Sequence, residues 1–326
     1  MRTYLDFEKP IADLEGRIEE LRLEAKEGGA GLQAAEEEIE RLQGKVDQLL
    51  KDTYGKLTRW QKTLVARHAA RPKFANYVEH LVEDFTPLAG DRKFGEDEAI
   101  LGGPAKFRGR SVVIIGHEKG ADTQGRVKHN FGMASPEGYR KAIRLMELAE
   151  RFSMPVLTLV DTPGAYPGRG AEERGQAEAI AACTDRTLSL GAPVVATIVG
   201  EGGSGGAVAL AAANSVLMME HAVYSVISPE GCASILWKDA AGKGESKAPE
   251  AAEAMKISAE DLKSLGVIDS IVQEPLGGAH RDPVLAIERL GDAIESALDG
   301  FKGMDAGALR RQRREKFLAI GRAGAA

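Results

Sequence analysis

The chain has 326 residues, and its 43 Lys and Arg against 49 Asp and Glu give a formal net charge of −6. With about 43% hydrophobic and 28% charged residues, it has the apolar content of a packed globular protein, so intrinsic disorder is not expected. Mild acidity disfavours a nucleic-acid binder, and no apolar run reaches the roughly 18 residues of a membrane helix. The charged first ten residues lack the apolar core of an export signal, so we expect a cytoplasmic protein without membrane contact.

The two cysteines exclude two further classes of protein. Cys183 and Cys232 are far apart, and neither belongs to a C-x-x-C pair. A disulfide framework and a thiolate zinc site are therefore not expected, and no pair of histidines has the helical i, i+4 spacing of a metal site. We expect no metal on this chain.

The first seventy or so residues predict two packed helices. Apolar residues recur there at steps of three and four, the spacing of one helix face, and charged residues fill the other faces. The first run is Ile11, Leu14, Ile18 and Leu21, and the second is Leu32, Ala35, Ile39, Leu42, Val46 and Leu49. Gly28, Gly29 and Gly31 interrupt the pattern as a chain reversal would. We expect a helical hairpin over residues 1–70, docked on the rest of the chain or on another subunit, because two helices alone bury too little surface.

From about Ser111 the pattern changes to alternating strands and helices. Buried apolar runs predict strands at 112–116, 155–160, 193–199 and 266–272. Helical stripes lie between them, one beginning at Ser135-Pro136 and others at 177–188, 225–237 and 258–265. We expect an α/β domain over residues 71–300 with a parallel or mixed sheet covered on both faces. The basic tail, 301–326, carries Arg310, Arg311, Arg313, Arg314 and Lys316, which we interpret as a solvated helix face.

Two glycine-rich loops follow predicted strands. The first is DTPGAYPG at 161–168, and the second is GEGGSGG at 200–206. In an α/β sheet the carboxyl ends of strands bind ligands, and glycine lets bare N–H groups approach a ligand closely. Five glycines in seven residues exceed the need of one turn, so the second loop is the stronger candidate for a functional site.

The second loop matches several motifs at once, so each match is weak. Gly200, Gly202 and Gly205 fit a dinucleotide-binding G-x-G-x-x-G with Glu220 as the ribose acid. The same tract fits the G-x-S-x-G elbow of a serine hydrolase with Ser204 as nucleophile, and Asp269 and His280 follow in the required order. The D-T-P-G of the first loop resembles a GTPase switch, but the chain has no G-x-x-x-x-G-K-[ST] motif, which excludes that class.

Chemistry done by backbone donors uses both glycine loops and needs no metal or nucleophile. Paired N–H groups at a glycine-rich helix start can stabilise a developing oxyanion. A separate basic segment carries Lys119, Arg126, Lys128 and His129 and could hold phosphates of a large cofactor. A solvated loop is the interpretation that we favour for this segment.

The residues resemble the α subunits of bacterial acetyl-CoA carboxylase carboxyltransferases. The resemblance rests on five segments in the same order: DTPGAYPG (161–168), AEERGQ (171–176), GEGGSGGA (200–207), YSVISPEGCASILWK (224–238) and LGVIDSIVQEPLGGAHR (265–281). It extends from YLDFEKPI near the N-terminus to about residue 290. It implies a crotonase-like α/β fold, a superhelix of ββα units, here preceded by the helical hairpin.

The resemblance also implies a reaction and its partners. Such subunits transfer the carboxyl group of carboxybiotin, held on a biotin carboxyl carrier protein, to acetyl-CoA, and the malonyl-CoA formed feeds fatty acid biosynthesis. The implied assembly is an α2β2 heterotetramer working with biotin carboxylase. The β subunit carries a four-cysteine zinc ribbon and most of the acetyl-CoA site.

Transferred residue by residue, the resemblance assigns the N–H groups of Gly205 and Gly206 to an oxyanion hole for the biotin ureido oxygen. Gly164, Ala165 and Tyr166 are expected to form a pocket wall, and Gly202 and Gly203 to shape the turn. The released ureido nitrogen is expected to take the acetyl proton, with a glycine pair on β holding the enolate. Two rival hypotheses remain open at this point: a serine hydrolase using Ser204, and a non-enzymatic scaffold whose hairpin recruits partners.

Overall fold

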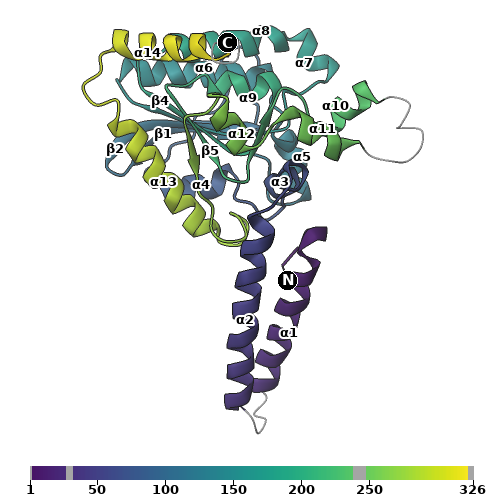
Figure 1. Cartoon of the computed structure of the whole chain (residues 1–326). Helices are drawn as coiled ribbons and strands as arrows, with labels where there is room; N and C mark the ends of the chain where they lie inside the picture. Colours follow the sequence, from purple (N-terminus) through teal and green to yellow (C-terminus); the bar gives the residue numbers. More distant parts are fainter. Residues whose placement is uncertain (1, 27–31, 238–246, 322–326) are drawn as a thin grey trace.

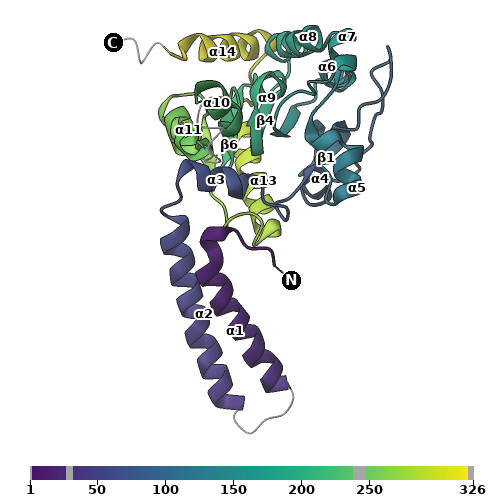
Figure 2. The ribbon, with the colours of Figure 1, turned by 90° about the vertical axis from the view of Figure 1, so that its right-hand side faces the viewer.

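A computed structural model describes residues 2–26, 32–237 and 247–321. Figure 1 shows an α/β body from which a two-helix arm projects, and the quarter turn of Figure 2 shows the same separation. In the described residues, no helix combines the length and the apolar character needed to span a bilayer.

The projecting arm is the helical hairpin that the apolar spacing predicts. After a short 3-10 turn, η1 (Asp6–Glu8), it consists of α1 (Lys9–Lys26) and α2 (Leu32–Tyr54). Ile11 and Ile18 of α1 pack against Leu42 and Val46 of α2 in one buried cluster. The predicted reversal at Gly28, Gly29 and Gly31 lies outside the described residues. The boundary of a separate unit at residue 70 stays a prediction, since α3 (Arg59–Ala66) already packs on the body.

The body is built on one seven-stranded sheet. The strand order is β1-β2-β3-β4-β5-β7, and β6 pairs with β4 beyond the end of β5. Only the pair β1–β2 is antiparallel, and the other pairs are parallel. The strands are β1 (Ile100–Phe107), β2 (Arg110–His117), β3 (Val156–Thr162), β4 (Val194–Gly203), β5 (Ser215–Met219), β6 (Val223–Ser225) and β7 (Ser270–Val272).

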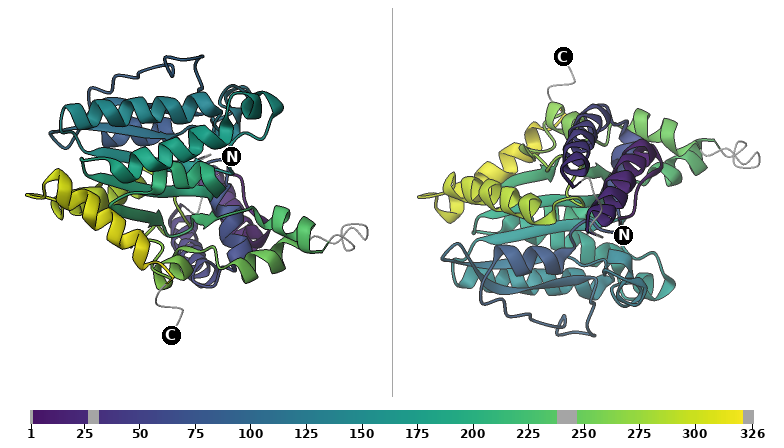
Figure 3. Two further views of the ribbon diagram at one scale, coloured as in Figure 1. Left: turned by 90° about the horizontal axis from the view of Figure 1, so that it is seen from above. Right: turned by 90° about the horizontal axis from the view of Figure 1, so that it is seen from below.

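Helices cover both faces of this sheet, as the continuous apolar strands require. Figures 1 and 3 show α6, α8 and α9 on one side and α4 and α13 on the other, with α14 lying beside α8. The remaining helices flank the strand ends. The helices of the body are α4 (Phe74–Leu81), α5 (Thr123–Lys128), η2 (Asn130–Gly132), α6 (Pro136–Arg151), α7 (Arg169–Glu173), α8 (Gln176–Ser189), α9 (Ser204–Ala211), α10 (Pro229–Leu236), α11 (Ala248–Met255), α12 (Ala259–Ser264), α13 (Pro283–Asp299) and α14 (Ala306–Ala319).

The edge strand β1 is absent from the sequence expectation. Its segment ILGGPAKF has two glycines and a proline, which disfavour a central strand. At the edge they are useful: a Cβ at Gly103 would lie 1.9 Å from the carbonyl oxygen of Thr86, so glycine lets the 86–88 segment run alongside. The N–H of Thr86 donates to the carbonyl of Pro104, which gives this edge a partner.

The other differences concern boundaries. The sequence predicts a helix that begins at residue 225, but the structure has no helix over residues 225–227. β6 ends at Ser225, and α10 begins only after Ser228, whose hydroxyl accepts a hydrogen bond from the N–H of Gly231. The expected strand at 266–272 is reduced to Ser270–Val272, since Gly266 has a left-handed φ of 69°.

The basic tail is a solvated face only in part, since Arg310, Arg311 and Arg314 are exposed but Arg313 and Lys316 contact the body. Arg313 is fully buried, and its guanidinium donates to the carbonyls of Thr187, Leu190 and Ala192. Lys316 pairs with Asp269. The tail helix docks because Arg313 satisfies the free carbonyls at the end of α8, where the helix dipole attracts a cation.

Candidate functional site

The second glycine loop forms the junction between β4 and α9. Gly203 is the N-cap of α9 and offers no capping side chain, so the N–H groups of Ser204, Gly205 and Gly206 lie in a first turn without helical acceptors. Ser204 has a left-handed φ of 53°, which turns the chain sharply from strand into helix. Gly205 is half-buried and Gly206 is buried. This is the arrangement in which main-chain donors and the helix dipole attract a negatively charged oxygen.

The two glycine loops touch each other through their backbones. A Cβ at Gly203 would lie 2.2 Å from the carbonyl carbon and oxygen of Pro163, and one at Gly206 would lie 2.9 Å from the nitrogen of Ala165. Gly164 itself has a φ of 150°. Close backbone approach is therefore the reason for glycine at Gly203 and Gly206, whereas at Gly164, where a Cβ would meet nothing within 4 Å, it is the positive φ.

Tyr166 and Gly202 lie at the border of this junction. The N–H of Tyr166 donates to the carbonyl of Ala134, and its own carbonyl accepts from the side chain of Gln176. About a third of Tyr166 is exposed. A Cβ at Gly202 would lie 2.7 Å from the ring of Tyr224, so glycine there leaves room for that ring. The structure thus brings the predicted residues 164–166 and 202–206 to one end of the sheet.

An apolar groove lies beside the start of α9. It has a volume of about 340 Å³ and is lined, next to Ser204, mainly by Val208, Tyr224, Val226, Met255, Leu262 and Val267. Val226 is 81% exposed, an unusual exposure for a β-branched apolar side chain. A flat, mostly apolar ring that carries one polar oxygen would find both an apolar surface and main-chain donors here.

A group of paired charges lies behind the glycine loop. Lys119 contacts Asp161 at 2.7 Å and Glu201 at 2.8 Å, and Arg67 donates to Glu201 at 2.6 Å. The N–H of Glu201 donates to Asp161 at 2.9 Å, which ties the end of β4 to the end of β3. Asp161 and Glu201 belong to the two glycine-loop motifs, but the sequence analysis assigned them no function. Their partners Lys119 and Arg67 lie in distant segments of the chain, so the sequence does not indicate these ion pairs.

These ion pairs decide the protonation of the two acids. Burial alone would raise the pKa of Asp161 and of Glu201. The Lys119 ammonium outweighs burial in both, helped by Lys73 for Asp161 and by Arg67 for Glu201, and lowers both pKa values below their usual range. Both acids are carboxylates at neutral pH and are poor proton acceptors.

The catalytic triad of the rival hydrolase hypothesis does not form. Asp269 accepts hydrogen bonds from the N–H of Val216, near the start of β5, and from Lys316, whereas Ser204 follows the carboxyl end of β4. His280 stacks on His68 with ring centroids 4.1 Å apart, and both of its ring nitrogens lack a hydrogen-bond partner. In the described part of the chain Ser204 has no hydrogen bond to a histidine, so the G-x-S-x-G match is a coincidence of a glycine-rich tract.

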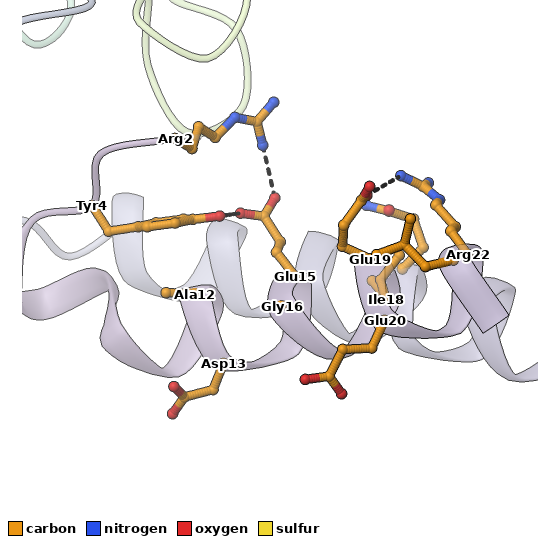
Figure 4. A pocket seen from close by; sticks show the side chains of 12 residues that line it. Arg2, Tyr4, Ala12, Asp13, Glu15, Gly16, Ile18, Glu19, Glu20 and Arg22 are labelled. Carbon is orange, nitrogen blue, oxygen red and sulfur yellow. Dashed lines mark hydrogen bonds and ion pairs between the residues drawn. The ribbon is translucent and has the colours of Figure 1, made fainter.

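A cavity of about 1020 Å³ lies on the arm and not at the sheet. Figure 4 shows it between the N-terminal segment and α1, where Arg2 and Tyr4 both bind the carboxylate of Glu15. None of its lining residues comes from a glycine loop. Over residues 2–26, 32–237 and 247–321, no group of three or more His, Cys, Asp or Glu side chains is placed to hold a metal ion.

Comparison with known proteins gives one consistent family. The family model described as "Acetyl co-enzyme A carboxylase carboxyltransferase-like" matches residues 4–321. The acetyl-coenzyme A carboxylase carboxyl transferase subunit alpha of Azorhizobium caulinodans is 61% identical over 323 residues, and that of Xanthobacter autotrophicus is 63% identical over 322. Each alignment covers 99% of this chain and 99% of the relative.

Solved structures share the fold at low sequence identity. A transcarboxylase 12S crystal structure matches with a TM-score of 0.57 and 19% identity, over 71% of this chain and 42% of that chain. The β subunit of P. aeruginosa geranyl-CoA carboxylase matches with a TM-score of 0.54 and 16% identity, over 78% of this chain and 46% of that chain. This chain therefore spans less than half of either neighbour. These likenesses confirm the expected crotonase-like α/β fold.

Proposed function

The chain belongs to the family of acetyl-CoA carboxylase carboxyltransferase α subunits, and on this premise we propose how its glycine junction serves carboxyl transfer to acetyl-CoA. As an α subunit it is one part of a multi-subunit carboxylase that includes a β subunit. The finer picture is our proposal: an α2β2 assembly in the cytoplasm, supplied by a biotin carboxyl carrier protein and biotin carboxylase, that makes malonyl-CoA for fatty acid synthesis.

We assign the polar part of the biotin site to the first turn of α9. The N–H groups of Gly205 and Gly206 would hold the ureido oxygen, and the free first-turn amides without a capping side chain are the observation that carries this assignment. The groove of about 340 Å³ beside them fits a flat bicyclic ring, with Val208, Tyr224 and Val226 as its apolar wall. When bound, the biotin group supplies the activated carboxyl group.

The contact between the loops would give the junction its rigidity. Gly164 and Ala165 press against Gly203 and Gly206 through backbone atoms, so the amides of α9 cannot shift without moving the first loop. A donor that is fixed before the reaction stabilises developing charge without reorganisation. Gly164, Ala165 and Tyr166 would thus act as a wall behind the donors, and Gly202 and Gly203 as the turn that aims them.

Among the residues that the structure describes, we assign no side-chain base at this junction. Asp161 and Glu201 are ionised but bound to Lys119 and Arg67, and their lowered pKa values make them weak bases. The acidic members of the junction therefore have a positioning role in our proposal. Removal of the acetyl proton is left to groups outside this chain's side chains.

The first test is dependence on the partner subunit. We expect no malonyl-CoA from acetyl-CoA and a carboxybiotin donor with this chain alone, and formation once the β subunit is added, because most of the acyl-CoA site is expected on that subunit. A radioactive label in the carboxyl group of the carboxybiotin donor, recovered in malonyl-CoA, measures the reaction. Robust turnover by the isolated chain would contradict the proposal.

The second test separates main-chain from hydroxyl chemistry. Gly205→Val places branched carbons over the donor amides, and we expect a loss of 10²–10³-fold in kcat, the order found for removing an oxyanion donor. Ser204→Gly removes the hydroxyl at a position where glycine suits the φ of 53°, and we expect it to retain most of the activity. If Ser204→Gly lost the activity and Gly205→Val kept it, the hydroxyl of Ser204 and not the amides would be the essential group.

A further inference from the structure

A second cavity at the carboxyl ends of β2, β3 and β4 plays no part in the proposed transfer. Its volume is about 250 Å³, and its lining residues are Ala66, Arg67, Lys73, Lys119, Arg126, Phe131, Pro163 and Glu201. Four cations therefore face one carboxylate. Such strand ends are where α/β sheets bind ligands, and an excess of cations favours an anionic one.

Two of the four cations are already neutralised. Lys119 lies between Asp161 and Glu201, and Arg67 lies between Glu201 and Glu230. Lys119 is mostly buried rather than part of the solvated loop that the sequence favours, because Asp161 and Glu201 reach it from β3 and β4. The acids of the site make their direct contacts with Lys119 and Arg67, so the other two cations are left without an ion pair.

Lys73 and Arg126 are the two cations of the cavity that form no ion pair. Throughout the described ranges, neither side chain has a hydrogen bond or an ion pair. Lys73 is only 8% exposed, and a buried ammonium without a partner is costly to the fold. Burial, together with the nearby Lys119, Arg71 and Arg126, lowers the pKa of Lys73 despite the attraction of Asp161. A bound anion would remove this cost.

The wall of the cavity also offers an aromatic ring. Phe131 lines it and is 48% exposed, and both Phe131 and Asn130 have left-handed φ values, of 55° and 47°. Two consecutive non-glycine residues in this region are unusual and concentrate at functional sites. A ring presented in this way can stack on a planar group that is joined to the anion.

We propose that this cavity is a phosphate-binding site in which Lys73 and Arg126 bind the oxyanion, while Lys119 and Arg67 are held in place by acids. The occupant is either free inorganic phosphate or a phosphate group of coenzyme A. Arg67, Pro163 and Glu201 also line a narrow pocket that reaches Gly202 and Gly203, so the site opens towards the glycine junction. The proposal rests on the charges and the cavity and does not depend on the roles assigned to Gly205 and Gly206.

Isothermal titration of the full chain with inorganic phosphate at constant ionic strength tests the site directly. We expect saturable binding to one site, weakened at least tenfold in Lys73→Met and in Arg126→Gln. Lys128→Gln is the matched control: Lys128 lies on the same helix α5, is exposed and pairs with Glu98, and its removal should leave the affinity unchanged.

The thermal midpoint provides a second measurement on the same proteins. Phosphate should raise the midpoint of the wild type and not that of Lys73→Met, which should itself be at least as stable as the wild type without phosphate. Should Lys73→Met fail to fold, Arg126→Gln, at a half-exposed position, carries the test. Absence of saturable binding by the wild type, or equal weakening in Lys128→Gln, would overturn the proposal.

Competition identifies the source of the phosphate. If coenzyme A displaces bound phosphate and dephospho-coenzyme A does so at least tenfold more weakly, the 3′-phosphate of the coenzyme is the occupant. If neither displaces it, the site belongs to the free anion. Both results support the site, because each requires phosphate to bind at Lys73 and Arg126.

Discussion

At the scale of single residues, the glycines of this chain differ in what they do. Gly203 and Gly206 have backbone atoms of the neighbouring loop within 3 Å of where a Cβ would be. Gly44, inside α2, has nothing within 4 Å of that point. The contact between the loops requires glycine at positions 203 and 206. At position 44 glycine only increases the conformational entropy of the unfolded chain, which makes the helix less stable.

Alanine substitution should separate these two kinds of glycine. We expect Gly203→Ala to lower the free energy of unfolding by about 1–3 kcal/mol, the cost of overpacking, because a methyl group would overlap the carbonyl of Pro163. Gly44→Ala should raise it by about 0.5–1 kcal/mol, the usual gain in a helix interior. Urea unfolding measures both, and equal stabilities would show that the loops do not need their close backbone contact.

At the scale of elements, the attachment of α14 depends on one buried arginine. The guanidinium of Arg313 donates to carbonyls at and after the end of α8 and to the side chain of Asn214. Leu309, one turn earlier on α14, is buried on the same side. The helix is thus held by satisfying the carbonyls that α8 leaves free, rather than by its apolar content.

Replacing this arginine should detach the helix. Arg313→Met keeps most of the side-chain volume but leaves several buried carbonyls without a donor. We expect it to lower the free energy of unfolding by at least about 3 kcal/mol. Arg314→Met is the control, since Arg314 is exposed and should change the stability little. Chemical denaturation compares the two, and hydrogen exchange over residues 306–319 reports on the helix itself. Equal stability of both variants would contradict this role of Arg313.

At the scale of the whole molecule, a small buried junction links the arm to the body. Tyr54 at the end of α2 donates to Glu8, and Arg281, after β7, binds Glu15 on α1. His280 lies in this junction, stacked on His68 and near Tyr54. The junction joins segments more than 200 residues apart, so its stability reflects the docking of the arm.

Acid should weaken this junction. Burial lowers the pKa of His280 to about 3, and the neighbouring His68, Arg71 and Arg281 add to the effect while Glu274 opposes it. The unfolded chain binds a proton near pH 6.5 and the folded chain only near 3, so stability falls as the pH drops through that window. We expect the thermal midpoint to fall from pH 6.5 to 4.5, and less steeply in His280→Phe, which keeps the stacked ring.

Calorimetry of the full chain between pH 6.5 and 4.5 measures how steeply the thermal midpoint falls with pH in the wild type and in His280→Phe. The exposed His80 on α4 provides the control, because His80→Gln should leave the slope unchanged. An unaltered slope in His280→Phe would mean that His280 does not resist protonation in the folded state.

The sequence by itself determined the local elements and the family. The apolar steps from Ile11 to Leu49 specify the arm, and the β-branched runs before Asp161 and Gly200 specify two central strands, because a repeat along the chain dictates which face is buried. The glycine loops indicated the candidate site between β4 and α9, since an excess of glycine at strand ends has few structural explanations. The motif segments were specific enough to imply the family before any geometry was known.

Only the tertiary structure decided which charges meet. It placed Lys73 and Arg126 in one cavity, buried Arg313 under α8, and kept Asp269 and His280 away from Ser204. It also made a strand of residues 100–107, whose glycines and proline suit the edge of a sheet. In each case the partner lies far along the chain, and electrostatic and steric complementarity between distant segments leaves no periodic signal in the sequence.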